Sequence, residues 1–139
     1  MSYDPNNIFA KIIRGDAPCF KVYEDEKTLA FMDVMPQAEG HTLVIPKEHA
    51  VSIHDLSPES AAALIQTTQR VAAAVKTVTK TPGILLAQLN GAAAGQTVFH
   101  IHFHIIPRSG GIDLNLHARD KADFEQLKSL AAKIAAAVQ

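Results

Sequence analysis

Three histidines alternate with apolar residues in segment 98–108, Val-Phe-His-Ile-His-Phe-His-Ile-Ile-Pro-Arg. Successive side chains of an extended strand point to opposite faces of a sheet, so His100, His102 and His104 are expected to share one face. The apolar residues between them then form the other face. The spacing therefore predicts a half-buried strand that carries three titratable imidazoles in a row.

Two readings of this row do not require catalysis by an imidazole. Residues two apart on a strand lie about 6.6 Å apart, so two imidazoles can converge on a metal ion, whereas the outer pair at about 13 Å cannot easily join them. A metal site would then need a further donor, for which the candidates are Asp33, His41 and His49. The second reading is a solvent-facing sheet surface that happens to carry histidines.

Nucleophilic catalysis is the interpretation we favour. A neutral imidazole is a good nucleophile near pH 7, and its attack on phosphorus gives a phosphorus–nitrogen intermediate that water can cleave. One flanking histidine can bond the phosphate or protonate the leaving group, and the other can hold the tautomer and orientation of the nucleophile.

The loop that precedes the histidine row has the composition of a phosphate-binding loop. Gly91 and Gly95 permit close approach of the backbone, while Asn90, Gln96 and Thr97 supply neutral donors for phosphate oxygens. An ordinary hairpin loop would have a similar composition, and what distinguishes this one is its direct connection to the histidines.

The remaining sequence predicts the elements that must position these residues. Helical spacing of apolar residues in 8–14, closed by Gly15, predicts a short helix, and Ser57 followed by Pro58 predicts the start of a helix of about 22 residues. A C-terminal helix is expected over about 120–138, with Asp120 as its cap and an apolar stripe from Phe124 to Val138 facing inward. Strands are expected at 19–23, 29–34, 41–45, 84–89 and 98–108. This order predicts an α+β fold with a mainly antiparallel sheet of about five strands.

Composition limits the partners and the compartment. The 139 residues carry a formal net charge of −1, which gives no electrostatic footprint for nucleic acid or an anionic membrane surface. The single cysteine, Cys19, which we interpret as a small strand residue, suits a reducing compartment. Without a signal-like N-terminus or an apolar run of about 18 residues, the chain is expected to be a single domain, 1–139, in the cytoplasm.

The segment 95–108, Gly-Gln-Thr-Val-Phe-His-Ile-His-Phe-His-Ile-Ile-Pro-Arg, resembles the signature of the histidine triad (HIT) family, His-φ-His-φ-His-φ-φ, where φ is an apolar residue. Three upstream segments, 8–15, 29–33 and 40–47, resemble the family in the expected order. The resemblance covers about residues 7–108 and leaves the C-terminal helix outside it. It implies the HIT fold, a homodimer and a purine nucleotide substrate.

What is known of the family implies a role for each matching residue. Family members include nucleoside phosphoramidases and dinucleoside polyphosphate hydrolases that act through a nucleotidyl-histidine. By motif position, His102 would be the nucleophile, His104 would contact the phosphate and leaving group, and His100 and His41 would support them. The nucleotide-binding residues would be Asn90, Gln96 and Thr97 for the phosphate, Asp33 for the ribose, and Phe9, Ile12, Phe31 and Val34 for the base. A nucleotide-binding interaction module with vestigial hydrolysis is the alternative.

Two departures from the family pattern are visible. Many bacterial members bind zinc through two cysteines, completed by histidines that correspond to His49 and His100, but the cysteine positions here hold Asn7 and Ala10. No metal and no other cofactor is therefore expected. After Arg108 the chain continues into a helix rather than the short tryptophan-bearing ending of the phosphoramidase branch, which leaves the leaving-group preference open.

Overall fold

The computed structural model describes residues 2–110 and 121–139. Helices and strands follow one another as α1 (Ile8–Ile13), β1 (Lys21–Glu24), β2 (Thr28–Met32), β3 (Thr42–Pro46), α2 (Pro58–Thr79), β4 (Gly83–Gln88), a 3-10 turn (Ala92–Ala94), β5 (Phe103–Arg108) and α3 (Phe124–Ala137). The predicted α+β class is confirmed, as are the short N-terminal helix, the long central helix and the C-terminal helix.

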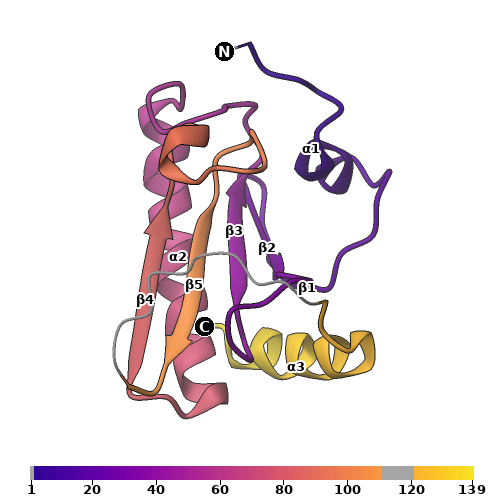
Figure 1. The fold of residues 1–139 in the computed structure, drawn as a ribbon, viewed down its shortest axis with the longest axis vertical. Coiled ribbons are helices and arrows are strands. Elements are labelled where there is room, and N and C mark those ends of the chain that lie inside the picture. The colour runs from indigo at the N-terminus through magenta and orange to yellow at the C-terminus, as the bar shows by residue number, and fades with distance from the viewer. Residues whose placement is uncertain (1, 111–120) are drawn as a thin grey trace.

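The five strands form one open sheet in the order β1-β2-β3-β5-β4, and every neighbouring pair is antiparallel (Figure 1). Strand β5, which carries the last histidine of the row, lies between β3 and β4. His104 is opposite Leu43 on one side and Ala87 on the other. This histidine is therefore held by pairing on both edges of its strand.

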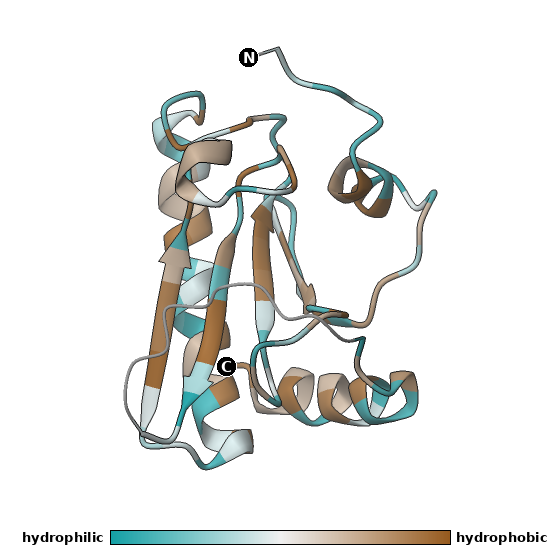
Figure 2. Cartoon of the chain, in the orientation of Figure 1, coloured by the Kyte–Doolittle hydropathy of each residue, from teal (hydrophilic) through white to brown (hydrophobic). Residues whose placement is uncertain are grey.

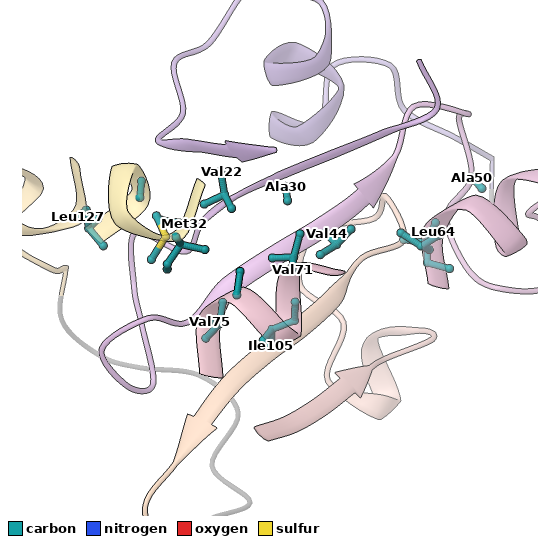
Figure 3. Packing of buried hydrophobic residues seen from close by; sticks show 14 residues of the cluster. Val22, Ala30, Met32, Val44, Ala50, Leu64, Val71, Val75, Ile105 and Leu127 are labelled. Carbon is teal, nitrogen blue, oxygen red and sulfur yellow. The ribbon is translucent and has the colours of Figure 1, made fainter. Parts of the chain in front are cut away.

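Both faces of the middle of the sheet are covered. Ala30, Met32, Val44 and Ile105 point into a core shared with α2 and α3 (Figure 3). The residues that alternate with them on β2 and β3, which are Leu29, Phe31, Leu43 and Ile45, form a second cluster with Phe9 of α1. Strands β2 and β3 are buried along their whole length for this reason. Hydrophobic residues dominate the strands, whereas the N-terminal segment before α1 is largely hydrophilic (Figure 2).

Helix α2 begins and ends as predicted. The Ser57 hydroxyl accepts a hydrogen bond from the amide of Ser60 at 3.2 Å, and Pro58 occupies the first helical position. Lys80 closes the helix in the left-handed region with φ of 56°. The buried side of α2 includes Leu64, Val71 and Val75, which pack on the sheet.

The start of α3 differs from the prediction. Asp120 lies outside the described residues, and the helix is capped by Asp123, whose carboxylate accepts from the Glu125 amide at 2.9 Å. Phe124 is therefore the first helical residue and is 50% exposed, so the expectation that it faces inward was wrong. The inward stripe consists of the buried Leu127, Ala131 and Ile134, and the partly buried Leu130 and Val138 pack against the same core.

Strand β5 is shorter than the sequence indicated. Its pairing with β3 ends where Val44 meets Phe103, and upstream of this point the Ile101 amide donates to Ala50 O at 2.9 Å. His100 and His102 therefore precede the strand, and only His104 belongs to it. The alternation persists, however, because Ile101 and Ile105 enter the core shared with α2.

The histidine row is not a half-buried surface. The exposed fractions are 0% for His100, 6% for His102 and 5% for His104, because the sheet face that carries them is covered from the side of α1. The reading as a solvent-facing sheet surface is therefore wrong.

Other differences from the predicted elements are confined to their ends. Strand β1 begins at Lys21, so Cys19 precedes it, and β2 ends at Met32 rather than Val34. Pro46 is the last residue of β3, opposite Thr28, rather than the residue after it. No helix in the described part of the chain is long and apolar enough to cross a membrane.

Candidate active site

A pocket of about 550 Å³ opens beside His102 and His104, between α1, the end of β2 and the segment that leads into β5. Six of the residues predicted to bind nucleotide line it: Phe9, Ile12, Phe31, Asp33, Val34 and Thr97. The structure thus brings the four apolar residues predicted to hold a base, a carboxylate and two histidines to one cavity.

The pocket also contains residues that the sequence prediction missed. They are Ile8, Ala17, Pro18, Cys19, Met32, Met35, Leu43 and Val98. For Leu43 a signal existed, because in the predicted strand 41–45 it points to the sheet face opposite that of Thr42 and Val44. For Ala17, Pro18 and Cys19 the sequence offered none, since the turn after α1 reaches the cavity only through the packing of α1 on the sheet.

The ring of His102 is oriented by the main chain. Its Nδ1 lies 2.7 Å from the carbonyl oxygen of His100, and because a carbonyl can only accept, Nδ1 carries the proton and donates. The neutral imidazole then has its lone pair on Nε2. The ring of Phe9 packs perpendicular to this ring with centroids 4.9 Å apart, which limits its rotation. His102 thus has the tautomer of a nitrogen nucleophile.

The ring of His104 has the opposite tautomer. The Gln37 amide donates to Nδ1 of His41 at 3.0 Å, so the proton of His41 lies on Nε2. That nitrogen is 3.0 Å from Nδ1 of His104, which must accept, and the proton of a neutral His104 is therefore on Nε2. Asp33 Oδ2 lies 3.4 Å from His41 Nε2, so a carboxylate adjoins the same contact.

The third member of the row is held at both ring nitrogens. His100 Nε2 donates to Pro46 O at 2.8 Å, and the Tyr3 hydroxyl lies 2.5 Å from Nδ1. Burial lowers the pKa of His100 to about 4, although the bond to Pro46 O partly opposes this shift. His100 is therefore neutral at pH 7, and Nδ1 accepts from the tyrosine.

Two glycines of the loop 90–97 have a backbone conformation that favours glycine, and the polar side chains of the loop are used unequally. Gly91 and Gly95 have φ of 92° and 101°, a region that favours glycine. Thr97 lines the histidine pocket, whereas Gln96 and Asn90 do not. The Gln96 side chain donates to Val51 O and accepts from the Gly91 amide, both at 2.7 Å.

Asn90 performs a similar task at the start of the loop. Its Oδ1 accepts from the Ile53 amide at 2.8 Å, and its amide pairs with the side chain of Gln88. Both Asn90 and Gln96 thus tie the loop to the chain that follows β3, and their expected role as phosphate donors stays a prediction.

The residues at the family's zinc position do not fit a zinc ion. The Asn7 side chain accepts a hydrogen bond from the Ala10 amide at 2.9 Å as the N-cap of α1. The Ala10 side chain has no atom that can ligate a metal ion. Between the two histidines of this position lies Tyr3, which is stacked on His49 with centroids 4.5 Å apart and contacts His100 through its hydroxyl. The space is occupied by a phenol instead of metal ligands.

Among residues 2–110 and 121–139, one group of three side chains has ligand atoms within 4.8 Å of one another, and it consists of Asp33, His41 and His104. Two of these were named as donors in the metal reading of the row, whereas His49 is not part of the group. The contacts between His41 and the other two, at 3.0 and 3.4 Å, match the hydrogen-bond chain described above.

Comparison with known proteins places this site in a family. Residues 14–111 match the family model described as the HIT domain. The chain is 42% identical to Protein hit of Bacillus subtilis, with 94% of this chain and 92% of that protein covered. It is 48% identical to adenosine 5'-monophosphoramidase hnt1 of Schizosaccharomyces pombe, with 73% of each covered.

A solved structure matches almost the entire length. It is that of a Hit-like protein involved in cell-cycle regulation from Bartonella henselae, with an unknown ligand, at a TM-score of 0.91 and 48% identity. The match covers 99% of this chain and 100% of that one, and so it includes α3. The family model, the relatives and the histidine arrangement together show that the chain belongs to the histidine triad (HIT) family.

Proposed function

We propose that this protein is a nucleotide hydrolase or transferase that cleaves the α-phosphate linkage of purine nucleoside phosphoramidates or dinucleoside polyphosphates through a nucleotidyl-histidine intermediate. The observation that carries the proposal is the bond from His102 Nδ1 to His100 O, which directs the lone pair of a pocket-lining imidazole to Nε2. The similarity to the fission yeast protein named adenosine 5'-monophosphoramidase hnt1 supports the substrate class.

The first chemical step uses the two opposite tautomers of His102 and His104. Nε2 of His102 attacks the α-phosphorus, a phosphorus–nitrogen bond forms, and the bond from phosphorus to the leaving group breaks. The leaving group departs with the bonding electrons, accepts a hydrogen bond from Nε2–H of His104 and takes a proton from solvent. The ring centroids of the two histidines are 4.9 Å apart, so both can reach groups on one phosphorus.

The second step restores the enzyme. Water attacks the α-phosphorus of the nucleotidyl-histidine, the phosphorus–nitrogen bond breaks, and its electron pair returns to Nε2 of His102. The attacking water releases a proton to solvent, which balances the proton that the leaving group took in the first step. The product is the nucleoside monophosphate.

The rest of the pocket fits the remainder of a nucleotide. Phe9, Ile12, Phe31 and Val34 line the pocket and are proposed to contact the base, and Asp33, on the same pocket, is proposed to accept from the ribose hydroxyls. Thr97 adjoins the histidines and is a candidate donor to the phosphate.

The competing proposal is a nucleotide-binding interaction module in which hydrolysis is vestigial. Both proposals predict binding of AMP or GMP, and only turnover separates them. The test is hydrolysis of adenosine 5'-phosphoramidate and of diadenosine polyphosphates by the purified protein, with AMP release as the readout. Turnover of either substrate supports the enzyme, whereas AMP binding with no turnover of either favours the module.

A further inference from the structure

The N-terminal segment before α1 returns to the histidine cluster through Tyr3. The Tyr3 hydroxyl is 2.5 Å from Nδ1 of His100, a contact that spans 97 residues of sequence. The ring of Tyr3 is stacked on His49 with centroids 4.5 Å apart and an interplanar angle of 17°. Two separate contacts thus fix this side chain.

The direction of the Tyr3–His100 bond follows from the other nitrogen of His100. Nε2 lies 2.8 Å from Pro46 O, a carbonyl that can only accept, and so Nε2 holds the proton of the neutral ring. Nδ1 is then an acceptor and the phenol donates. His100 is 0% exposed, so without the phenol this acceptor is buried with no donor that the described contacts supply.

His100 is connected to the nucleophile by its own main chain. Its carbonyl oxygen accepts from Nδ1 of His102 at 2.7 Å. The amide of Ile101, which belongs to the same peptide plane, donates to Ala50 O at 2.9 Å. The ring of His100 and this peptide plane together determine where the acceptor for His102 lies.

We propose that Tyr3 is a positioning residue for the nucleophile: its hydroxyl fixes the ring of His100, and the main-chain carbonyl of His100 in turn fixes the tautomer and orientation of His102. This inference rests on the proposed function for its effect on kcat, but the protonation and orientation of the His102 ring can be measured without any substrate. Tyr3 is not among the residues that line the pocket, and so it acts through His100 rather than on the nucleotide.

The kinetic test compares two variants that each remove one phenol hydroxyl. Tyr3→Phe keeps the ring that stacks on His49 and deletes the donor to His100. Tyr23→Phe is the matched control, because Tyr23 is the only other tyrosine and its hydroxyl donates to Asp25 on the β1–β2 turn at 3.0 Å, away from the pocket. On adenosine 5'-phosphoramidate, Tyr3→Phe is expected to lower kcat about tenfold with KM nearly unchanged, and Tyr23→Phe to change neither. Wild-type kcat in Tyr3→Phe overturns the proposal.

A third variant separates the hydroxyl from the ring. Tyr3→Leu lacks both, and the proposal predicts about the same loss of kcat as in Tyr3→Phe. A loss confined to Tyr3→Leu would assign the effect to stacking on His49 and would overturn the role given to the hydroxyl.

Nuclear magnetic resonance of the protein with ¹⁵N-labelled histidine tests the positioning role without any substrate. The wild type is expected to show His102 protonated at Nδ1 and His100 at Nε2, and Tyr3→Phe to shift the ring nitrogens of both, whereas Tyr23→Phe leaves them in place. Unchanged His102 resonances in Tyr3→Phe overturn the positioning role whether or not the wild type is active. If the wild type hydrolyses no nucleotide but these resonances shift as expected, the proposed function has failed and the positioning of His102 stands.

Discussion

Nδ1 of His102 lies 2.7 Å from the carbonyl oxygen of His100, and this bond gives His102 a tautomer opposite to that of His104. The protons of the two rings, whose centroids are 4.9 Å apart, lie on Nδ1 in His102 and on Nε2 in His104. One ring therefore presents a lone pair and the other a proton to the same pocket. A displacement at phosphorus can use the lone pair as nucleophile and the N–H as hydrogen-bond donor, and two histidines supply these groups through different hydrogen-bond partners.

Asp33 is expected to distinguish ribonucleotides from deoxyribonucleotides. Its carboxylate lines the pocket, and a carboxylate that accepts from two vicinal hydroxyls loses a bond when one hydroxyl is missing. Asp33→Asn is the preferred variant, because Oδ1 also accepts from the Met35 amide at 2.8 Å and an asparagine keeps that acceptor. Calorimetry should show AMP binding weakened by about tenfold and dAMP binding by much less.

The matched control for this variant is Asp16→Asn. Asp16 pairs with Arg14 at 2.6 Å on the surface and does not line the pocket. Its substitution should leave both affinities unchanged. An AMP-to-dAMP ratio in Asp33→Asn that equals the wild-type ratio would remove Asp33 from the ribose site.

Stability is expected to fall in mild acid because of His100. Burial lowers the pKa of His100 to about 4, below its ordinary value of 6.5, so between these values the unfolded chain binds a proton that the folded chain does not. The stability from this group is therefore fully present above pH 6.5 and is lost as the pH falls toward 4. The loss is on the order of 3 kcal/mol, since one pKa unit corresponds to about 1.4 kcal/mol.

Urea unfolding at pH 7 and pH 4 measures this loss. His100→Gln has no titrating group at this position and should show a smaller decrease in the free energy of unfolding than the wild type. His54→Gln removes an exposed histidine and should decrease as the wild type does. Equal pH dependence in the wild type and His100→Gln would contradict the assignment.

The homodimer stays a prediction, and the open edge of the sheet suggests where it would form. Within residues 2–110 and 121–139 no strand pairs with the outer edge of β4, and Leu86 on this strand is 44% exposed. An open, apolar edge strand readily pairs with a second copy. Leu86→Lys should therefore lower the mass found by sedimentation equilibrium at micromolar concentration from about twice 15.0 kDa toward the monomer value.

Ala62→Lys is the control for the dimer. This alanine is exposed on α2, on the side that faces the β1–β2 turn at the other end of the sheet, and its substitution should leave the mass unchanged. A wild-type mass near 15.0 kDa would refute the dimer, and a dimeric Leu86→Lys would move the interface away from β4.

Local signals in the sequence were sufficient for most of the fold. Alternation of apolar residues predicted the strands, and Ser57 with Pro58 predicted the start of α2 to the residue, because capping is a local interaction. The same reasoning failed for α3, where two aspartates were available and the one nearer to Phe124 forms the cap. A local pattern does not distinguish between two acceptable caps.

The candidate site was predicted in part, because its composition is local but its geometry is not. The histidine row identified His102 and His104. It did not predict that β5 begins only at Phe103, because the Ile101 amide upstream of the strand donates to Ala50 O, which is 51 residues away in the sequence. Tyr3 was missed for the same reason, since nothing in a hydrophilic N-terminal segment indicates a contact with His100. Such contacts arise only once the sheet and α1 have assembled.

The most direct test of the account is the rate at which the His102→Ala variant releases AMP from adenosine 5'-phosphoramidate. The variant keeps His104, His41 and the apolar wall of the pocket, and it should still bind AMP, but it lacks the Nε2 lone pair of His102 that would form the covalent bond. The account predicts a rate at least about a thousandfold below that of the wild type and of the exposed-histidine control His54→Ala. A rate near the wild-type value in His102→Ala would contradict the nucleotidyl-histidine mechanism.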